Sequence, residues 1–334
     1  MVRTAERTKD VARSLTPGLA VVAVATVIAL LVAHFVPALN SSIVAVALGV
    51  LVTNLGWHRP MLHPGTHFAG QRVLRVAVVV LGLQLSLPEL LHLGGAGLGV
   101  VVVTVTVTFL GTRLLGRLLG VSPARSLLIA TGFSICGASA VAAMQPVADG
   151  DKEDTATAVA LVTLCGSLAI LVLPLLQGPL GLDVASFGSW VGASVHDVGQ
   201  TVATAERVPG ALTTAIVVKL TRVVLLAPLV LVVSMGARRR NPGVSGHRPP
   251  PMPLFVASFL GAVLLTSTGL LPAGLLAGAK TVQGVLLAAA LFGLGTGIHV
   301  PTLLRTGGRA LVLGLCSWVL VAAVAYAGVR LVGA

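Results

Sequence analysis

Three ionisable side chains lie deep within apolar stretches of the sequence, where charge is costly and usually functional. Asp197 at such a depth costs about 3 kcal/mol on insertion scales. Lys219 and Arg222 are three residues apart and therefore share one helix face. Two cations facing a cavity would attract an anion, and a guanidinium suits tetrahedral oxyanions through paired hydrogen bonds. The alternative is a structural ion pair between Asp197 and Arg222, which a bound anion could still compete for.

Polar residues surround Asp197 in the apolar segment 184–205. His196 is adjacent in sequence, so on a regular helix it would point about 100° away from Asp197. Gln200 and Thr201 follow at spacings that place them on the face of Asp197. We interpret His196, Asp197, Gln200 and Thr201 as a coupling and gating element for H+ or Na+. The alternative is an interhelical hydrogen-bond clamp.

A run of small and hydroxyl-bearing residues interrupts the apolar segment 125–146. Such residues weaken a helix, and a broken helix directs free N–H groups and a positive dipole end at an anion. The alternative is close helix packing, which small residues also permit. Together with Lys219 and Arg222, the predicted anion-binding residues are Ser134, Cys136, Gly137, Ala138 and Ser139.

Two further deep polar residues, Gln84 and His299, are candidates for coupling or gating. His299 could carry a proton, or it could lie at a helix end in the headgroup layer. The cysteines share no metal-ligand spacing, so we expect no metal or cofactor. An intramembrane enzyme using Cys136 and His196 is a weaker alternative, and we predict that the chain is not an enzyme. There is no Gly-x-x-x-x-Gly-Lys-Ser/Thr loop, which argues against ATP-driven transport by this chain alone.

The composition restricts the class of protein that can position these residues. Of 334 residues, 56% are apolar and only 32 are charged, and the mean hydropathy is +1.01. A soluble domain carries charge on about a quarter of its residues, so this chain has too little polar sequence for a water-facing surface. The net charge of +12 is spread over several loops, which argues against a nucleic-acid partner. The composition therefore predicts an all-α polytopic protein of the lipid bilayer.

Apolar stretches of about 20 residues predict about eleven transmembrane helices. The predicted spans are 17–37, 40–56, 71–87, 95–119, 125–146, 155–178, 184–205, 211–236, 252–271, 280–300 and 309–331. Because the connections are short, we predict a single transmembrane transporter domain over 1–334, with a cytoplasmic segment at 1–16 and a cytoplasmic basic loop at 237–251. The first span could be a signal peptide, but its length and the absence of a clear cleavage site argue otherwise.

The basic residues predict the orientation of the chain. With eleven crossings, sixteen of the 22 Lys and Arg residues lie on the N-terminal side, four lie on the other side and two lie within a span. Cytoplasmic loops are enriched in Lys and Arg, so this imbalance predicts a cytoplasmic N-terminus in a bacterial inner membrane. The same topology places the acidic run 149–154 on the outside.

An internal repeat relates the first half of the sequence to its end. A shift of 213 residues aligns Gly82 with Gly295 and Pro88 with Pro301, together with flanking Leu and Gly pairs. The second, third and fourth predicted spans then match the ninth, tenth and eleventh. An odd displacement of seven spans would turn the copies upside down, and inverted repeats with interrupted helices are typical of secondary transporters. Chance alignment of Leu- and Gly-rich spans is the alternative.

Three blocks of sequence resemble the signature of the YeiH family of bacterial membrane proteins, which are described as sulfate exporters. The blocks are 134–140, 194–200 and 219–223, the last followed by Ala227-Pro228. The family often has Glu at the position of Asp197 and Ala at that of Gly199. Because Asp is one methylene shorter than Glu, the acidic role carries over more safely than the exact reach of the side chain. The resemblance implies a distant similarity to bile acid/sodium symporter-like carriers, with two broken, crossing helices.

These observations predict a secondary active transporter that exports a small sulfur oxyanion, such as sulfate, sulfite or a sulfonate, by alternating access. The expected partners are a small inorganic or organic anion and the lipid bilayer, and a homodimer is a possible assembly. A cation-coupled importer of an organic anion is the alternative within transport.

Overall fold

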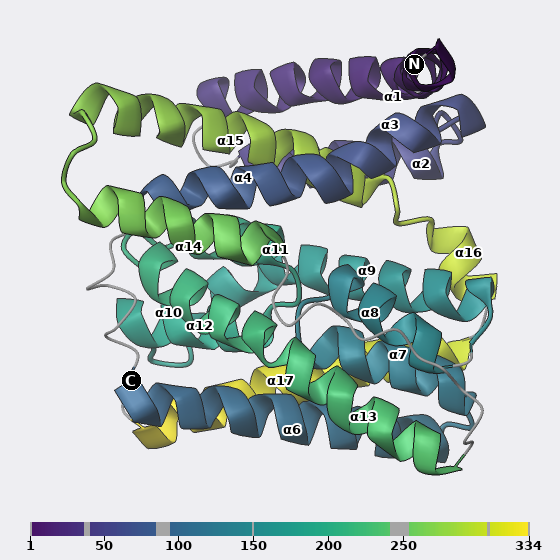
Figure 1. Ribbon diagram of the computed structural model, residues 1–334. Helices are drawn as coiled ribbons and strands as arrows, with labels where there is room; N and C mark the ends of the chain where they lie inside the picture. Colours follow the sequence, from purple (N-terminus) through teal and green to yellow (C-terminus); the bar gives the residue numbers. More distant parts are fainter. Residues whose placement is uncertain are drawn as a thin grey trace. The chain divides into compact units, whose positions relative to one another are not determined.

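The computed structural model describes residues 2–36, 41–84, 94–148, 150–240, 254–305 and 308–332, and all regular structure in these ranges is helical (Figure 1). The helices are α1 (Val2–Phe35), α2 (Ser41–Asn54), α3 (His63–Phe68), α4 (Leu74–Leu81), α6 (Gly94–Leu118), α7 (Pro123–Ser134), α8 (Ala138–Ala148), α9 (Lys152–Leu176), α10 (Val184–Ser194), α11 (Val198–Ala205), α12 (Leu212–Val224), α13 (Leu226–Arg240), α14 (Leu254–Ser267), α15 (Ala273–Gly295), α16 (Val300–Arg305) and α17 (Gly308–Val332). Short 3-10 or π turns occur at Pro60–Leu62, Ala69–Val73 and Gly82–Gln84. The predicted all-α class is confirmed for the described residues.

Long apolar helices give the chain its membrane character. Seven helices among the described residues are long and apolar enough to cross a bilayer. They are Ser14–Phe35, Pro60–Gln84, Gly97–Leu118, Glu153–Leu176, Leu212–Gly236, Ala273–Gly295 and Gly308–Val332. Three further apolar helices are shorter, including α2 and α8. A multi-pass membrane protein is therefore supported, whereas the predicted count of eleven spans is not confirmed.

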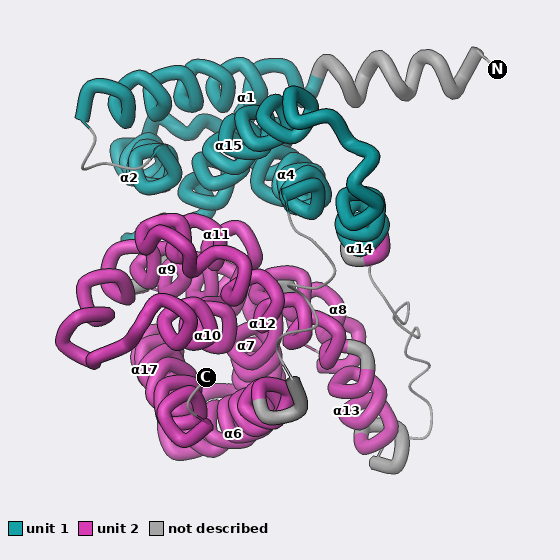
Figure 2. Tube along the Cα trace, turned by 90° about the vertical axis from the view of Figure 1, so that its left-hand side faces the viewer, with its two compact units in different colours: residues 1–86, 258–301 teal, residues 87–257, 302–334 magenta. Residues whose placement is uncertain are grey.

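The chain forms two compact units, each built from two separate stretches of sequence (Figure 2). Unit 1 comprises residues 1–86 and 258–301, and unit 2 comprises residues 87–257 and 302–334. The single transmembrane domain over 1–334 stays a prediction.

Unit 1 is held together by close contacts between glycine-bearing helix faces. A β-carbon on Gly295 of α15 would lie 3.2 Å from the Cα of Gly49 on α2. A β-carbon on Gly293 would likewise lie 3.1 Å from the Cα of Gly70. Thr53 Oγ1 donates to the carbonyl of Thr296 at 2.9 Å. The contacts of α2 move from Gly295 at Gly49 to Thr296 at Thr53. Because they advance along both helices in the same order, α2 and α15 run side by side in the same direction.

Helix bounds agree with the predicted 213-residue repeat, although Pro88 and the Leu pair that follows it lie outside the described residues. Adding 213 to the ends of α2 (41 and 54) gives the ends of α14 (254 and 267). The same shift takes the start of the span Pro60–Gln84 to the start of α15. Short connections make α2 antiparallel to the span Pro60–Gln84 and α14 antiparallel to α15. Since α2 and α15 are parallel, the corresponding helices run in opposite directions, and the repeat is inverted within unit 1.

In unit 2 the third pair of that repeat, α6 and α17, packs directly together. A β-carbon on Gly111 would approach Leu320, and one on Gly328 would lie 2.8 Å from Val100 Cγ1. From Val100 to Gly111 the residue numbers rise along α6, whereas those of the contacted residues on α17 fall from 328 to 320. The two helices are therefore antiparallel. This is the relation expected for inverted copies.

The predicted span 125–146 is a hairpin rather than a crossing, and this corrects the sequence analysis. Arg125 lies in the first turn of α7, and Asp154 lies in the first turn of α9. The Nε of Arg125 donates to Asp154 Oδ1 at 2.5 Å. Gly150, which follows α8, has its β-carbon position 3.3 Å from the Cβ of Ala124. The outer ends of α7 and α8 therefore meet at the start of α9. An apolar run of this length can form one full span or two half-helices, and composition does not distinguish them.

The hairpin also corrects the side of the membrane that was predicted for the acidic run 149–154. Asp151, Glu153 and Asp154 lie on the same side of unit 2 as Arg125, because α8 returns the chain to the side from which α7 starts. Asp149 lies outside the described residues.

The predicted span 184–205 is a second hairpin, formed by α10 and α11. A β-carbon on Gly210, after the end of α11, would lie 3.2 Å from Val184 Cγ1 at the start of α10. A β-carbon on Gly188 would lie 2.6 Å from the carbonyl oxygen of Ala211, which shows that α12 starts beside α10. Because α9 has 25 residues, about 38 Å of helix separates the bases of the two hairpins. The hairpins therefore enter unit 2 from opposite sides.

The two hairpins form a second internal repeat, with a period of 60 residues. Adding 60 to Ser134, the end of α7, gives Ser194, the end of α10. Adding 60 to 138 and 152, the starts of α8 and α9, gives 198 and 212, the starts of α11 and α12. Each repeat is a hairpin followed by a long helix, and the two copies point in opposite directions.

Candidate functional site

The tip of the first hairpin is the connection from Ile135 to Gly137, between α7 and α8. Gly137 has φ of +72°, a conformation that side chains with a β-carbon rarely adopt. A β-carbon there would also lie 2.9 Å from Val162 Cγ1 on α9 and 3.8 Å from Asp197 Cβ. Glycine thus permits both the reversal of the chain and its close approach to the second hairpin. This confirms that the helix breaks within the predicted run of small residues.

The tip of the second hairpin is the connection from Val195 to Asp197, between α10 and α11. Asp197 is the N-cap residue of α11, and its side chain accepts a hydrogen bond from the N–H of Gly199 at 2.8 Å. Gln200 completes a capping box, because its Oε1 accepts from the N–H of Asp197 at 3.3 Å. The helix is unwound here, because α10 ends at Ser194 and α11 begins at Val198, so His196 and Asp197 do not lie on a regular helix. A carboxylate therefore covers the positive end of α11.

Arg222 on α12 joins the two tips. It is completely buried, and its guanidinium donates five hydrogen bonds to four main-chain carbonyls. On the first hairpin, Nη2 lies 3.0 Å from the carbonyl of Phe133 and 2.8 Å from that of Ser134. On the second, Nη1 lies 3.0 Å from the carbonyl of Val195. The five hydrogen bonds of Arg222 thus all go to main-chain carbonyl groups.

Lys219 has the same role one helix turn earlier. It is completely buried, and its Nζ donates to the carbonyls of Ile135 and Val195, the former at 3.4 Å. These carbonyls lie at or just beyond the C-terminal ends of α7 and α10, where helix dipoles are negative. Lys219 and Arg222 therefore hold the two hairpins together by neutralising both negative helix ends.

Gln200 attaches the second hairpin to the long helix of the first repeat. Its Nε2 donates to the carbonyl of Thr163 at 3.1 Å and to Ser167 Oγ at 3.4 Å, both on α9. A β-carbon on Gly166 would collide with the Gln200 amide. The glycine at 166 therefore creates the space that this side chain occupies.

His196 is the one tip residue whose polar atoms lack partners. Its side chain is completely buried, and neither ring nitrogen has a hydrogen-bond partner among the described residues. The ring packs against Phe133 of the first hairpin, with centroids 4.3 Å apart. Cys136 is also buried, but its thiol forms no hydrogen bond with His196. The nucleophile–base contact of the enzyme hypothesis is therefore not present.

The remaining predicted binding and coupling residues differ in their burial and in their hydrogen bonds. Ser134 is fully buried, and its hydroxyl donates to its own helix at the carbonyl of Thr131. Thr201 donates to the carbonyl of Asp197 at 2.8 Å rather than to its carboxylate. Ala138 and Ser139, in the first turn of α8, are partly exposed. Gln84 and His299 belong to unit 1.

Residue types did not predict the groups that hold the two cations and the amide of Gln200. Backbone carbonyls carry no sequence signature, so the ligands of Lys219 and Arg222 could not be found by residue type. Thr163, Gly166 and Ser167 form a polar and small triplet within an apolar span, and this was the available signal. The free cysteines are Cys136, Cys165 and Cys316, and the described residues contain no group of three or more metal-ligating side chains.

Comparison with known proteins identifies relatives over nearly the whole chain. A UPF0324 membrane protein of Corynebacterium glutamicum is 42% identical over 318 residues, covering 95% of this chain and 92% of the relative. One from Ralstonia nicotianae is 34% identical over 304 residues, covering 84% and 82% of the two chains. One from Lactiplantibacillus plantarum is 32% identical over 313 residues, covering 91% and 93%. No solved structure gives a significant match.

The family match covers both hairpins and the buried cations between them. Residues 17–314 match the family described as conserved hypothetical protein 698, which is the same family as YeiH. The similarity to bile acid/sodium symporter-like carriers is not shown by these comparisons. The chain therefore belongs to the conserved hypothetical protein 698 family of UPF0324 membrane proteins.

Proposed function

We propose that the chain is a secondary transporter of a small oxyanion, with its binding site at the two hairpin tips. The observation that carries this proposal is the excess positive charge buried where the tips meet. Lys219 and Arg222 are both fully buried, and the tips contain one carboxylate, that of Asp197. An uncompensated buried charge is costly, so such a site favours an anionic occupant.

Helix dipoles do not cancel this excess. Each hairpin brings one C-terminal helix end and one N-terminal helix end to its tip, so the four partial charges sum to about zero. The formal side-chain charges then leave one positive charge in excess. The N-terminus of α11 is covered by Asp197, whereas the partly exposed first turn of α8 contains Ala138 and Ser139. We therefore assign the anion to the α8 end, beside Gly137.

This assignment gives the predicted residues separate roles. Lys219 and Arg222 supply positive potential while bracing the tips, and Ser139 supplies a hydroxyl donor to the anion. His196, with two unpartnered ring nitrogens, and Asp197 are the candidates for coupling to H+ or Na+. The resemblance to the YeiH family makes sulfur oxyanions the first substrates to test and export the first direction.

The orientation that we propose keeps the N-terminus cytoplasmic. With the first hairpin returning to its starting side, Lys152 moves to the basic side, and the distribution changes from sixteen against four to seventeen against three. This stronger imbalance supports the same orientation in a bacterial inner membrane.

Flux measurements in proteoliposomes test the proposal. Sulfate, sulfite and taurine would be loaded on one side, and their movement would be followed with imposed H+ or Na+ gradients of either sign. We expect saturable flux of at least one anion, which Ser139→Ala weakens through a higher KM and Arg222→Ala abolishes. Arg207→Gln, an exposed change on the loop after α11, is the matched control and should resemble wild type.

The outcomes separate the alternatives. Flux that follows the imposed cation gradient inward for an organic anion would identify the importer instead. Equal flux for wild type, Ser139→Ala and Arg222→Ala would reject the tip site.

A further inference from the structure

A row of threonine hydroxyls is buried along one face of α6. Thr104, Thr108 and Thr112 follow one another at intervals of four residues, and each is completely buried. None of the three hydroxyls has a hydrogen-bond partner among the described residues. Thr106, on the exposed face of the same helix, instead donates to the carbonyl of Val102 at 2.8 Å. The buried threonines therefore lack the i−4 hydrogen bond that Thr106 makes within its helix.

Two serine hydroxyls lie beside the end of the row that is nearer the base of the first hairpin. Ser126 on α7 and Ser317 on α17 are buried, and in the described part of the chain neither hydroxyl has a partner. A β-carbon on Gly116 of α6 would collide with Ser126 Oγ, so Ser126 lies one helix turn beyond Thr112. Ser317 lies between the two leucines of α17 that approach α6 at 111 and 116, which places it about level with Thr112. These unpartnered hydroxyls thus gather where α6 packs against α7 and α17.

The inverted copy of α6 lacks most of this row. A shift of 213 residues takes Thr104, Thr108 and Thr112 of α6 to Ser317, Val321 and Ala325 of α17. All three counterparts are completely buried. The core at these helix positions can therefore be built with apolar side chains, and the fold does not require hydroxyls at 108 and 112.

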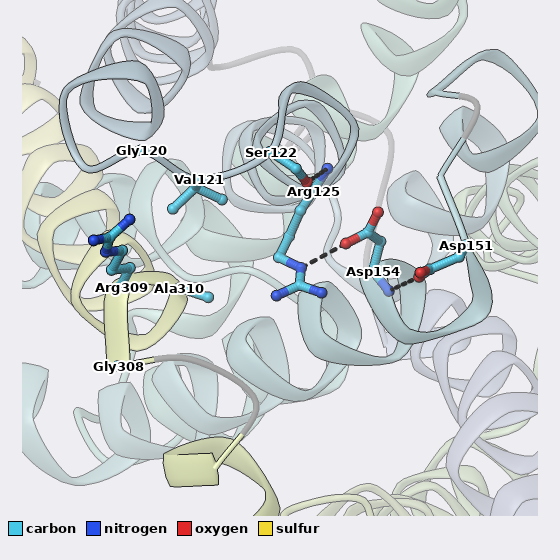
Figure 3. Close-up of a pocket in the computed structure, with 9 residues that line it drawn as sticks. All are labelled: Gly120, Val121, Ser122, Arg125, Asp151, Asp154, Gly308, Arg309 and Ala310. Atoms are coloured by element: carbon cyan, nitrogen blue, oxygen red, sulfur yellow. Dashed lines mark hydrogen bonds and ion pairs between the residues drawn. The ribbon is translucent and has the colours of Figure 1, made fainter.

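The row leads to a polar pocket of about 550 Å3 at the base of the first hairpin (Figure 3). Gly120, Arg125 and Ala310 line the pocket, and each lies within four residues of the place where α6 meets α7 and α17 at Gly116. The charged groups of the lining are two guanidiniums and two carboxylates, so the pocket favours neither anions nor cations. Its polar walls and its size suit water.

At its other end the row reaches the level of the hairpin tips. The chain turns back from α6 into α7, and the two helices meet where Gly116 approaches Ser126. Eight residues further along α7 lies Ser134, and eight residues back along α6 lies Thr108. Because both helices rise by about 1.5 Å per residue, these two residues are about level. The carbonyl of Ser134 accepts from Arg222, so the row spans the depth between the pocket and the tips.

The spacing of the row suits alternating hydroxyls and waters. Residues four apart on a helix are separated by about 6 Å along its axis, which is close to two O–H···O hydrogen bonds of about 2.8 Å each. A hydroxyl both donates and accepts, so it can bond to a water on either side. A buried hydroxyl without a partner is costly. One water between successive threonines would therefore satisfy the whole row.

We propose that this row is a single-file track of hydroxyls and waters that conducts protons between the pocket and the hairpin tips. Each hydroxyl accepts a proton from one neighbour and releases its own to the next, so the proton moves and the side chains are unchanged. The row contains no carboxylate and therefore offers no charged ligand to a metal cation. The use of these protons for coupling rests on the proposed function, whereas the presence of water in the row does not.

Exchange of a single thiol measures water access without a transport assay. In a background without the native cysteines, Thr108→Cys places one thiol in the row. The control is the protein that keeps only Cys165, a completely buried native thiol on α9. After the full-length protein in nanodiscs is transferred to D2O, infrared spectroscopy follows the conversion of S–H to S–D. We expect the thiol of Thr108→Cys to exchange at least about tenfold faster than that of Cys165, which meets water only when the fold opens locally.

Anion flux driven by an H+ gradient tests conduction. Thr108→Val removes the hydroxyl and keeps the shape of the side chain. It should slow H+-driven flux about tenfold, the effect of one lost hydrogen bond, and leave the KM for the anion unchanged. Thr108→Ser keeps the hydroxyl and should restore the rate. Thr106→Val, on the exposed face of α6, is the matched control and should resemble wild type.

The outcomes judge the track and the proposed function separately. Equal exchange rates for Thr108→Cys and Cys165 would show that the row is dry and would overturn the proposal. Equal H+-driven rates for Thr108→Val and Thr106→Val would overturn the proton route. Failure of the proposed function is a different result, because wild type would then move no anion while the thiol of Thr108→Cys still exchanged.

Discussion

At the scale of single residues, the buried charges of unit 2 act mainly on the backbone. Arg222 and Lys219 donate to carbonyls at the ends of α7 and α10, and Asp197 accepts from N–H groups at the start of α11. Each charge therefore stabilises a helix end that the break in the helix creates. The same residues that give the site its electrostatic potential also maintain its shape.

Replacement of Asp197 separates its structural role from a role in coupling. Asn is as good an N-cap residue as Asp, so Asp197→Asn should change the free energy of unfolding by less than about 0.5 kcal/mol, whereas Asp197→Ala should cost about 1 kcal/mol. If the carboxylate couples transport to a cation, Asp197→Asn should retain folding and lose the response of flux to an imposed H+ or Na+ gradient. Thermal unfolding and proteoliposome flux measure the two effects. An unchanged gradient response would assign Asp197 to capping alone.

His58 in unit 1 should make stability depend on pH. Burial and the stacked ring of His63, 4.4 Å away between centroids, lower the pKa of His58 to about 4. Because the unfolded chain binds this proton near pH 6.5, the unfolded state holds more protons between about pH 6.5 and pH 4. Stability should therefore fall as the pH decreases through this window and be unaffected by His58 above it. Unfolding midpoints of His58→Gln should lack this component, and an identical pH profile would contradict it.

At the scale of elements, the sequence predicted the breaks but not the direction of the chain after them. Glycine and hydroxyl-bearing residues at 131–140 and polar residues at 194–201 mark both tips correctly. The reversal was missed because two half-helices have the apolar length of one span. It depends on long-range contacts, such as that between Arg125 and Asp154, which local patterns do not encode. The 213-residue repeat was found because its copies preserve glycine and proline spacing, whereas the 60-residue repeat preserves helix bounds more than residue types.

Substitution of the tip glycine tests the geometry of the first hairpin. Gly137→Ala should strain a residue with φ of +72° and press a methyl group against Val162, at a total cost of about 2–4 kcal/mol. Gly181→Ala is the matched control, because Gly181 has φ of +61° but nothing within 4 Å of its β-carbon position. It should cost only about 1–2 kcal/mol. Equal losses in unfolding free energy would show that the approach to α9 is not tight.

At the scale of the whole molecule, the hairpins change which loops share a side of the membrane. The class of protein and its all-helical character followed from composition, since too few polar residues were available for a soluble surface. The side of the membrane on which each loop lies did not follow from composition, because each predicted span was counted as a crossing. Reclassifying two spans as hairpins moves the loops at 147–154 and 178–183 to opposite sides from those predicted and leaves the remaining loops in place.

Labelling of single cysteines tests this topology. In a background without Cys136, Cys165 and Cys316, the variants Arg117→Cys and Asp151→Cys should react with an impermeant reagent from the same side of the membrane. Arg207→Cys should react from the other side. All three native side chains are exposed, so access should not limit the reaction. Labelling of Arg117→Cys and Asp151→Cys from opposite sides would restore the eleven-span arrangement.

The glycine contacts of unit 1 have a mechanical consequence. Where Gly49 meets Gly295 and Gly70 meets Gly293, main chain lies directly against main chain. No rotamers are available at these contacts to absorb a displacement, so sliding one helix past another would require the backbones themselves to separate. Around these glycine contacts, α2, α15 and the helix carrying Gly70 should therefore move as one stiff block, whereas the hairpins of unit 2 are joined through side chains that can exchange partners.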